Sequence, residues 1–341
     1  MFNKFLKLWV IKIIKSGYVN LLLLWIGEYL YNSVIHDLSK KSLKFEDIIP
    51  KSIERKMNFI DKILKYCDPI ITVSEDKIKL RMRLSFKNVY FYARFPLYDR
   101  ALPRICHAIK NIENELFLID IGANIGDTAV LVSKNIHGGS ILCIEGNEQV
   151  IPFLKYNTAK IKNNKIFIDS RFCVDSHENN QFSVKMDYGT AHLSKSNTNK
   201  INAATLDDMI ADNSLFKNTN ILKIDTDGFE ITVLNGAKKL LKEKHPVLYF
   251  EFTPDAYIEN GQDPLTLINI LVSYSYTKAL FYTNFGIPVD IYDLTNKAMI
   301  QEAIKKIDNK NIYYYDILAI PDEKIDKYKI ILDNELEWKN N

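Results

Sequence analysis

The sequence predicts an α/β fold in which a doubly wound, mostly parallel sheet is covered by helices on both faces. Beyond residue 115, short apolar segments alternate with segments of helical periodicity. The apolar segments are continuous rather than alternately apolar and polar, which is typical of strands buried on both faces of a parallel sheet. Right-handed crossovers between such strands place helices on both sides of the sheet.

The first hundred residues precede this pattern, and we expect them to form helices and one β-hairpin. Residues 1–66 show helical periodicity, and two β-prone segments at 70–73 and 78–82 flank a short polar turn. We also expect a strand at 89–92 and a helix at 100–113. The predicted parts are an N-terminal extension at 1–98, a main domain at 99–321 and a C-terminal helical tail at 322–341.

The N-terminus allows two interpretations. A set of lysines shares roughly one side of the first expected helix: Lys4, Lys7, Lys12 and Lys15. The apolar run at 18–31 is interrupted by polar residues and falls short of the ~20 apolar residues that span a bilayer. No small-residue cleavage site of a signal peptide follows. Residues 1–31 are therefore either a basic amphipathic anchor for peripheral membrane contact or helices packed on the main domain. We expect a cytoplasmic protein, which the anchor would hold at the inner face of the membrane.

Within the main domain, strands and helices are expected in regular order. The expected strands are residues 116–121, 140–145, 165–174, 220–225 and 246–252, followed by 276–282, 287–292 and 313–320. The expected helices are 125–134, 148–160, 206–211, 230–241 and 264–274. Residues 181–186 are expected to form an antiparallel piece outside this alternation.

Composition argues against several classes of protein. The 341 residues carry a net charge of +3, which is too small by itself to indicate nucleic-acid binding. The four cysteines form no CxxC pair and the six histidines no HExxH pattern, which argues against a structural zinc site. The cysteines are expected to be free thiols in a reducing compartment.

The first strand of the main domain ends in Asp120, and Gly122, Asn124 and Gly126 follow in the turn to the next helix. Glycines let a backbone turn tightly and approach a ligand closely. The spacing lacks the middle glycine of G-x-G-x-x-G, which argues against a dinucleotide with its pyrophosphate on the helix N-terminus. S-adenosylmethionine has no phosphate, and Asp120 suits its ammonium and sulfonium charges. The alternative is that Asp120 caps the helix.

Glu145 ends the second strand. An acid at this position can accept hydrogen bonds from both hydroxyls of a ribose. The alternative is a surface carboxylate that caps the next helix. Together with Asp120, Glu145 favours a nucleoside ligand.

Three acids surround a glycine turn at the end of the fourth strand: Asp225, Asp227 and Glu230. Asp227 and Glu230 resemble an N-terminal cap with its reciprocal acid. No such structural role is available to Asp225, which is the better candidate for chemistry.

Two further residues are candidate bases. Glu251 lies between aromatic residues at the end of the fifth strand, where burial would raise its pKa and suit it to general-base catalysis. The alternative is a solvent-facing carboxylate. His192 lies on the connection before the fourth strand. It could act as a base, or it could have a purely structural role, as a lone histidine more often does.

In order and spacing, these residues resemble the FkbM-type methyltransferases. The resemblance rests on residues 120–126, 144–145, 189–193, 205–208, 222–230, 234–237 and 246–251, with weaker support at 316–321. It implies a Rossmann-like class I methyltransferase fold with a seven-stranded sheet, S-adenosylmethionine as cofactor, and O-methylation, often of sugars. Asp227 departs from the family, which more often has Glu there, so its contact with substrate is open.

The expected reaction is methyl transfer to a hydroxyl of a sugar or of a cell-surface glycan precursor. Asp225 or Glu251 would act as base, with Asp227 as a third catalytic candidate, and Asp225 would also contact the cofactor. A Mg²⁺ ion on Asp225, Asp227 and Glu230 could activate the hydroxyl instead. The expected cofactor contacts are Asp120, Gly122, Asn124, Gly126 and Glu145.

Other function classes stay open. One is a non-catalytic nucleoside-binding or membrane-associated scaffold on the same fold, and another is an NAD-dependent sugar-modifying enzyme. A nucleic-acid methyltransferase is disfavoured because the fourth strand does not end in the (D/N)PP(Y/F) signature. We therefore expect no nucleic-acid partner.

Overall fold

The computed structural model describes residues 17–41, 50–65, 67–75, 78–86, 88–95, 97–176, 181–187, 190–307 and 312–338. Contacts within the chain divide it into two units, Met1–Pro96 and Leu97–Asn341. The first holds the N-terminal helices and a hairpin, and the second holds a large central sheet. The C-terminal helix α14 (Ile325–Trp338) belongs to the second unit.

In the first unit, the long helix α2 (Gly17–Lys41) packs beside α3 (Lys51–Leu64) and the antiparallel hairpin of β1 (Ile70–Glu75) and β2 (Ile78–Arg83). The expected hairpin is thus confirmed. Buried Tyr31 of α2 donates a hydrogen bond from its hydroxyl to the carbonyl oxygen of Phe86, at 3.0 Å. Among the described residues, no helix combines the length and apolar character needed to cross a membrane.

The strand expected at 89–92 is wrong: Asn88–Arg94 form the helix α4. Aromatic residues favour strands because they suit a pleated, half-buried surface, and that preference yields to tertiary context. Here the helix buries Tyr92 and Ala93, and it packs on α2.

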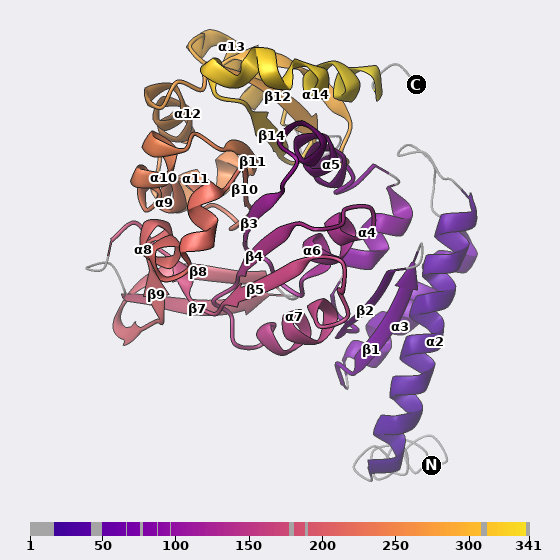
Figure 1. The fold of residues 1–341 in the computed structure, drawn as a ribbon. Coiled ribbons are helices and arrows are strands. Elements are labelled where there is room, and N and C mark those ends of the chain that lie inside the picture. The colour runs from indigo at the N-terminus through magenta and orange to yellow at the C-terminus, as the bar shows by residue number, and fades with distance from the viewer. Residues whose placement is uncertain are drawn as a thin grey trace. The chain divides into compact units, whose positions relative to one another are not determined.

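The second unit is built on one eight-stranded sheet with the strand order β13-β12-β14-β11-β10-β3-β4-β5 (Figure 1). The strands, in chain order, are β3 (Phe117–Ile121), β4 (Ser140–Ile144), β5 (Lys165–Asp169), β10 (Ile221–Ile224), β11 (Val247–Phe252), β12 (Lys278–Thr283), β13 (Pro288–Asp293) and β14 (Tyr315–Ala319). The five strands from β5 to β11 are parallel, whereas β14 runs antiparallel between β11 and β12.

The doubly wound, mostly parallel α/β fold is therefore confirmed, with eight strands in the sheet rather than the seven that the family resemblance implied. The eighth strand, β13, pairs antiparallel with β12 at the edge of the sheet. It is half-exposed, as an edge strand is. Two smaller pairs lie outside the sheet: β6 (Phe172–Cys173) with β9 (Ala203–Ala204), and β7 (Gln181–Asp187) with β8 (Thr190–Lys200).

Helices cover both faces of the sheet with two apolar clusters. One face packs against α8 (Leu206–Asp212), α9 (Glu230–Asn235), α10 (Lys238–Glu243), α12 (Pro264–Ser273) and α13 (Lys297–Lys305). The other face packs against α5 (Ala101–Glu113), α6 (Asp127–Ser133), α7 (Ile151–Thr158) and α14. On this second face, Arg104 of α5 holds the buried Glu335 of α14 through two hydrogen bonds of 2.8 and 2.6 Å.

The chain order of the strands creates a switch point between β3 and β10. From β3 the chain proceeds through β4 to β5 in one direction, and from β10 it proceeds to β11 in the other. In sheets of this kind, ligands bind beyond the carboxyl ends of the strands at such a point. The residues that follow β3 and β10 are those that the sequence analysis singled out.

Candidate active site

The glycine turn after β3 lies directly against the end of β10. Gly122 and Gly126 have φ of +76° and +81°. A Cβ atom at Gly122 would stand 1.7 Å from the carbonyl oxygen of Asp225, and one at Gly126 would stand 2.7 Å from the Leu154 side chain. Glycine is therefore required at Gly122 by a backbone-to-backbone approach across the switch point.

Glu145, which follows β4, holds this turn in place. Its two carboxylate oxygens accept hydrogen bonds from the backbone N–H groups of Asn124, at 2.9 Å, and Asn147, at 2.8 Å. Burial raises the pKa of Glu145, and these two hydrogen bonds oppose the rise. The carboxylate orders the turn rather than capping α7, which follows the N-cap position Val150 and has no side-chain cap. Its contact with a ribose stays a prediction.

Asp120 is fully buried and forms an ion pair with Lys223, a residue that the sequence analysis missed. Lys223 on β10 lies opposite Asp120 on β3, and its Nζ is 3.1 Å from Asp120 Oδ1 and 3.1 Å from Asp225 Oδ2. Asp120 does not cap α6, which begins after Gly126. Its contact with a cofactor stays a prediction, and Lys223 already compensates its charge.

The charges in this ion-paired group shift the pKa values of Lys223 and Asp120. Burial lowers the pKa of Lys223, but Asp120 and Asp225 outweigh this effect and raise it well above the usual lysine value. Burial raises the pKa of Asp120, and Lys223 opposes that rise. A lysine inside the otherwise apolar strand Ile-Leu-Lys-Ile was the signal that could have found Lys223, because a buried charge requires a partner.

The two remaining acids of the glycine turn have separate roles. Glu230 is buried, and its Oε1 accepts hydrogen bonds from both the backbone N–H and the hydroxyl of Thr226, each at 2.8 Å. Its Oε2 accepts the N–H of Gly228 at 3.1 Å. Asp227 has a left-handed backbone with φ of +51° and is not the cap of α9, which begins after Phe229 without a side-chain cap. The capping interpretation of Asp227 is therefore wrong.

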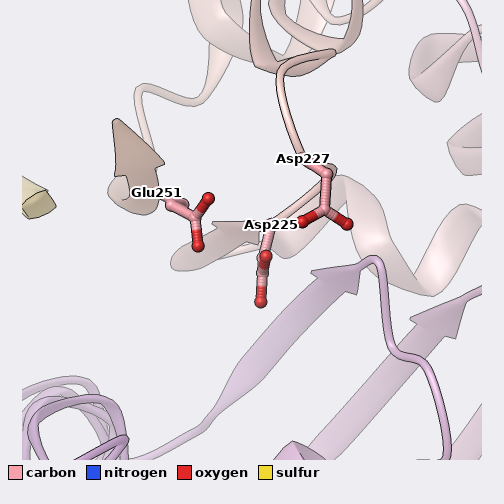
Figure 2. Close-up of side chains that lie close together, drawn as sticks. All are labelled: Asp225, Asp227 and Glu251. Atoms are coloured by element: carbon pink, nitrogen blue, oxygen red, sulfur yellow. The ribbon is translucent and has the colours of Figure 1, made fainter. Parts of the chain in front are cut away.

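Asp225, Asp227 and Glu251 come together at the ends of β10 and β11. A carboxylate oxygen from each lies within 4.8 Å of the other two, and Figure 2 shows the three groups gathered side by side. The hydroxyl of Thr253 donates a 2.6 Å hydrogen bond to Glu251. The structure thus groups the three expected catalytic residues, while the third acid expected to hold Mg²⁺, Glu230, is engaged by backbone donors.

Crowding of like charges perturbs this carboxylate group. The pKa of Asp227 is raised to about 7, mainly by burial and to a smaller extent by the charges of Asp225 and Glu230. Burial, followed by the charges of Asp225 and Asp227, raises the pKa of Glu251 well above its usual range. A cation or a proton that entered this group would relieve the repulsion.

A cavity opens beside this group, on the face of the sheet that α5 and α6 cover. It encloses about 410 Å³ of empty space, including its open mouth. Its lining includes Lys223, Asp225 and Glu251, together with three polar residues that the sequence analysis missed: Asp99, Tyr249 and Asp316. Asp99 precedes the first expected core strand, so only the folded chain brings it to the carboxyl ends of the strands.

His192 lies on β8, where its backbone pairs with Lys185. The side chains of this hairpin lie outside the described residues. A role for His192 as a base therefore stays a prediction.

The region that holds the sequence motifs also resembles a known protein family. Residues 120–278 match the family model described as "Methyltransferase FkbM domain", which confirms the resemblance expected from the sequence. No curated protein sequence matches the chain.

Solved structures give remote likenesses. Methyltransferase FkbM from Methylobacillus flagellatus is 14% identical over 60% of this chain and 44% of its own, with a TM-score of 0.36. Precorrin-6y C5,15-methyltransferase from Geobacter metallireducens is 13% identical over 63% and 86%, with a TM-score of 0.33. Magnesium protoporphyrin IX methyltransferase from Synechocystis, solved with bound S-adenosylhomocysteine (SAH), is 10% identical over 65% and 83%, with a TM-score of 0.34. The chain thus spans less than half the length of the first of these proteins. The fold of the chain is established by the strand order of its own sheet.

Proposed function

We propose, from the FkbM methyltransferase domain at residues 120–278, that this chain transfers the methyl group of S-adenosylmethionine to a hydroxyl of a sugar or glycan precursor. The observation that carries the proposal is the meeting of Gly122 and Asp225 across the switch point. Because of this contact the glycine turn lies next to the end of β10, which supports the proposal that a nucleoside ligand binds beside the carboxylates.

The cofactor would lie over the ends of β3 and β4. The Gly122–Gly126 turn lets the backbone approach it, and Glu145 keeps lone pairs free on both oxygens after accepting the N–H groups of Asn124 and Asn147. Those lone pairs can accept the two ribose hydroxyls. The absence of a middle glycine favours this ligand over a dinucleotide.

Methyl transfer requires alignment and removal of a proton. The acceptor oxygen attacks the methyl carbon in line, the carbon–sulfur bond breaks, and its electron pair stays on sulfur. The hydroxyl proton passes to a carboxylate and then to water. Glu251 is the better base of the two expected, because its pKa is raised well above the usual range, whereas Asp225 is ion-paired with Lys223 at 3.1 Å.

A divalent cation is the alternative means of activating the hydroxyl. Asp225, Asp227 and Glu251 offer three hard oxygen ligands whose mutual repulsion a cation would relieve. If the metal takes part, EDTA treatment abolishes turnover and Mg²⁺ restores it. Undiminished turnover after EDTA leaves Glu251 as the base.

The proposed reaction is tested by supplying S-adenosylmethionine with a deuterated methyl group to glycan precursors from a strain that lacks this chain. Mass spectrometry should find one labelled methyl per acceptor, bound to oxygen. Glu251→Gln should lower turnover by at least about a hundredfold, the usual contribution of a general base. The exposed Glu259→Gln is the matched control, and label on nitrogen or carbon would contradict O-methylation.

We also propose peripheral membrane contact by the N-terminal unit, in a cytoplasmic protein. Trp25 and Tyr29 stack on α2 with ring centroids 6.0 Å apart and are 67% and 63% exposed, and such rings favour the membrane interface. Trp25→Ser with Tyr29→Ser should reduce sedimentation with anionic liposomes, whereas Phe59→Ser on α3 should not. Unchanged sedimentation would exclude the contact.

A further inference from the structure

We infer that the acceptor carries a primary amine in its ammonium form, and that the cavity between α5 and the strands β10, β11 and β14 binds it. This inference rests on the proposed methyl transfer and specifies its substrate class as an amino sugar. The cavity lies next to the carboxylate group that would act on the hydroxyl.

Acidic side chains outnumber basic ones among the described residues that line the cavity, and they come from four separate segments of the chain. Among those described residues, the lining carboxylates are Asp99, Asp225, Glu251 and Asp316, and the one lining cation is Lys223. Lys223 is already shared between Asp120 and Asp225. Within the part of the chain that the structure describes, the other three lining carboxylates form no ion pair.

The strand register places two of these carboxylates directly opposite each other. Glu251 on β11 pairs with Asp316 on the antiparallel β14. Like charges in facing positions of neighbouring strands destabilise a sheet. Burial and the charges of Asp99 and Asp225 raise the pKa of Asp316 well above its usual range. A cationic ligand group between the two strands would offset this repulsion.

Tyr249 gives an independent indication of a ligand. Its side chain lines the cavity and is only 4% exposed, yet its hydroxyl has no partner of hydrogen-bond geometry among the described residues. Asp316 lies near enough for the Tyr249 hydroxyl to lower the pKa of that carboxyl, although the two groups do not meet in hydrogen-bond geometry. A buried hydroxyl without a partner costs free energy, which a bound N–H donor would recover.

Asp99 is held at the cavity by the fold itself. Its backbone is left-handed, with φ of +53°. Two residues before Asp99, the carbonyl oxygen of Leu97 stands 2.0 Å from where a Cβ of Gly286 would lie, so the turn is packed against the β12–β13 connection. Residues that their surroundings hold in a sparsely populated backbone conformation are frequent at ligand sites.

The ammonium is assigned to the acceptor rather than to the amino-acid arm of the cofactor. The cavity is lined by residues of α5, α6, β10, β11 and β14 and their flanking turns. None of its lining residues belongs to the Gly122–Gly126 turn, and Glu145 is absent from it too. The cavity therefore lies beside the cofactor half of the site, toward β14.

The test is a binding measurement on the full chain in EDTA, with saturating SAH. D-glucosamine is the probe, and D-glucose and N-acetyl-D-glucosamine are its uncharged counterparts. Calorimetry should show glucosamine binding at least about tenfold more tightly than either counterpart, the effect of a net charge-assisted contact. Equal affinity for the three sugars would overturn the inference.

Two variants locate the effect. Asp99→Asn and Asp316→Asn should each remove most of the preference for glucosamine, at undiminished melting temperature and unchanged SAH affinity. Asp290→Asn, on the exposed edge strand β13, is the matched control and should retain the preference. Weakened SAH binding in Asp99→Asn would assign the cavity to the cofactor and overturn the inference. Failure of the unaltered chain to bind SAH would instead overturn the proposed function.

Discussion

The carbonyl oxygen of Asp225 occupies the space where a side chain on Gly122 would stand, 1.7 Å from the position of its Cβ. This contact joins the cofactor half of the site, after β3, to the carboxylate half, after β10. We predict that Gly122→Ala separates the two strand ends and lowers SAH affinity at least tenfold, because even a methyl group cannot fit without a backbone shift.

Gly261→Ala is the control for this prediction. Gly261 also has a left-handed backbone, with φ of +72°, but no atom lies within 4 Å of its Cβ position. Gly261→Ala should lose only roughly 1–2 kcal/mol of folding stability, the cost of a left-handed backbone at alanine, and should keep its SAH affinity. Equal SAH affinity in the two variants would contradict the role given to the Gly122–Asp225 contact.

Lys223 is predicted to be essential for stability. Lys223→Met leaves the fully buried Asp120 without its cation, and breaking a buried ion pair in this way costs about 3–5 kcal/mol. Thermal unfolding should show a large loss, and adding Asp120→Asn should recover part of it. Lys305→Met, which breaks the exposed pair with Glu302, should leave the melting temperature nearly unchanged. Equal losses of stability in Lys223→Met and Lys305→Met would contradict the stabilising role given to the buried ion pair of Lys223 with Asp120.

Glu145 is predicted to act on cofactor binding through the glycine turn. Glu145→Gln places an amide N–H₂ against one of the two backbone N–H groups that the carboxylate accepts. SAH affinity, measured by calorimetry, should fall about tenfold or more. Glu148→Gln, three residues later and exposed, should leave it unchanged. Normal SAH binding by Glu145→Gln would remove Glu145 from the cofactor site.

Asp227 is predicted to make stability depend on pH. Its folded-state pKa of about 7 lies above its ordinary value of 3.8, so the stability that its protonated form contributes is complete below about pH 4. That stability is lost as the pH rises through about 7, where the folded protein must hold the charge. Asn suits the left-handed backbone and does not ionise.

The melting temperature of Asp227→Asn relative to the unaltered chain, measured in EDTA, should therefore increase between pH 4 and 8. A difference that does not change with pH would contradict a raised pKa at Asp227.

The fold was largely predictable because the buried strands are continuous apolar segments. The aromatic segment at α4 was not, since tertiary packing decided between helix and strand there. In the site, Asp225, Asp227 and Glu251 were predictable because parallel strands end at one edge of a sheet. Asp99 and Asp316 were not, because the first precedes the alternating pattern and the second lies on an antiparallel strand inserted beside β11.

The backbone role of Glu145 was also out of reach of the sequence, whereas the interpretation as a reciprocal acid had already directed Glu230 toward the backbone. A carboxylate after a strand can face a ligand or fold back onto N–H groups, and spacing alone does not distinguish the two. The structure shows both residues accepting backbone N–H groups. This makes them supports of the turns on either side of the switch point.

The central claim is that the turn after β3 and Glu145 hold S-adenosylmethionine. Calorimetry of the full chain with S-adenosylmethionine, SAH and NAD tests it most directly. We predict that the first two bind at one site per chain and that NAD does not. Binding of NAD alone, or of none of the three, would contradict it.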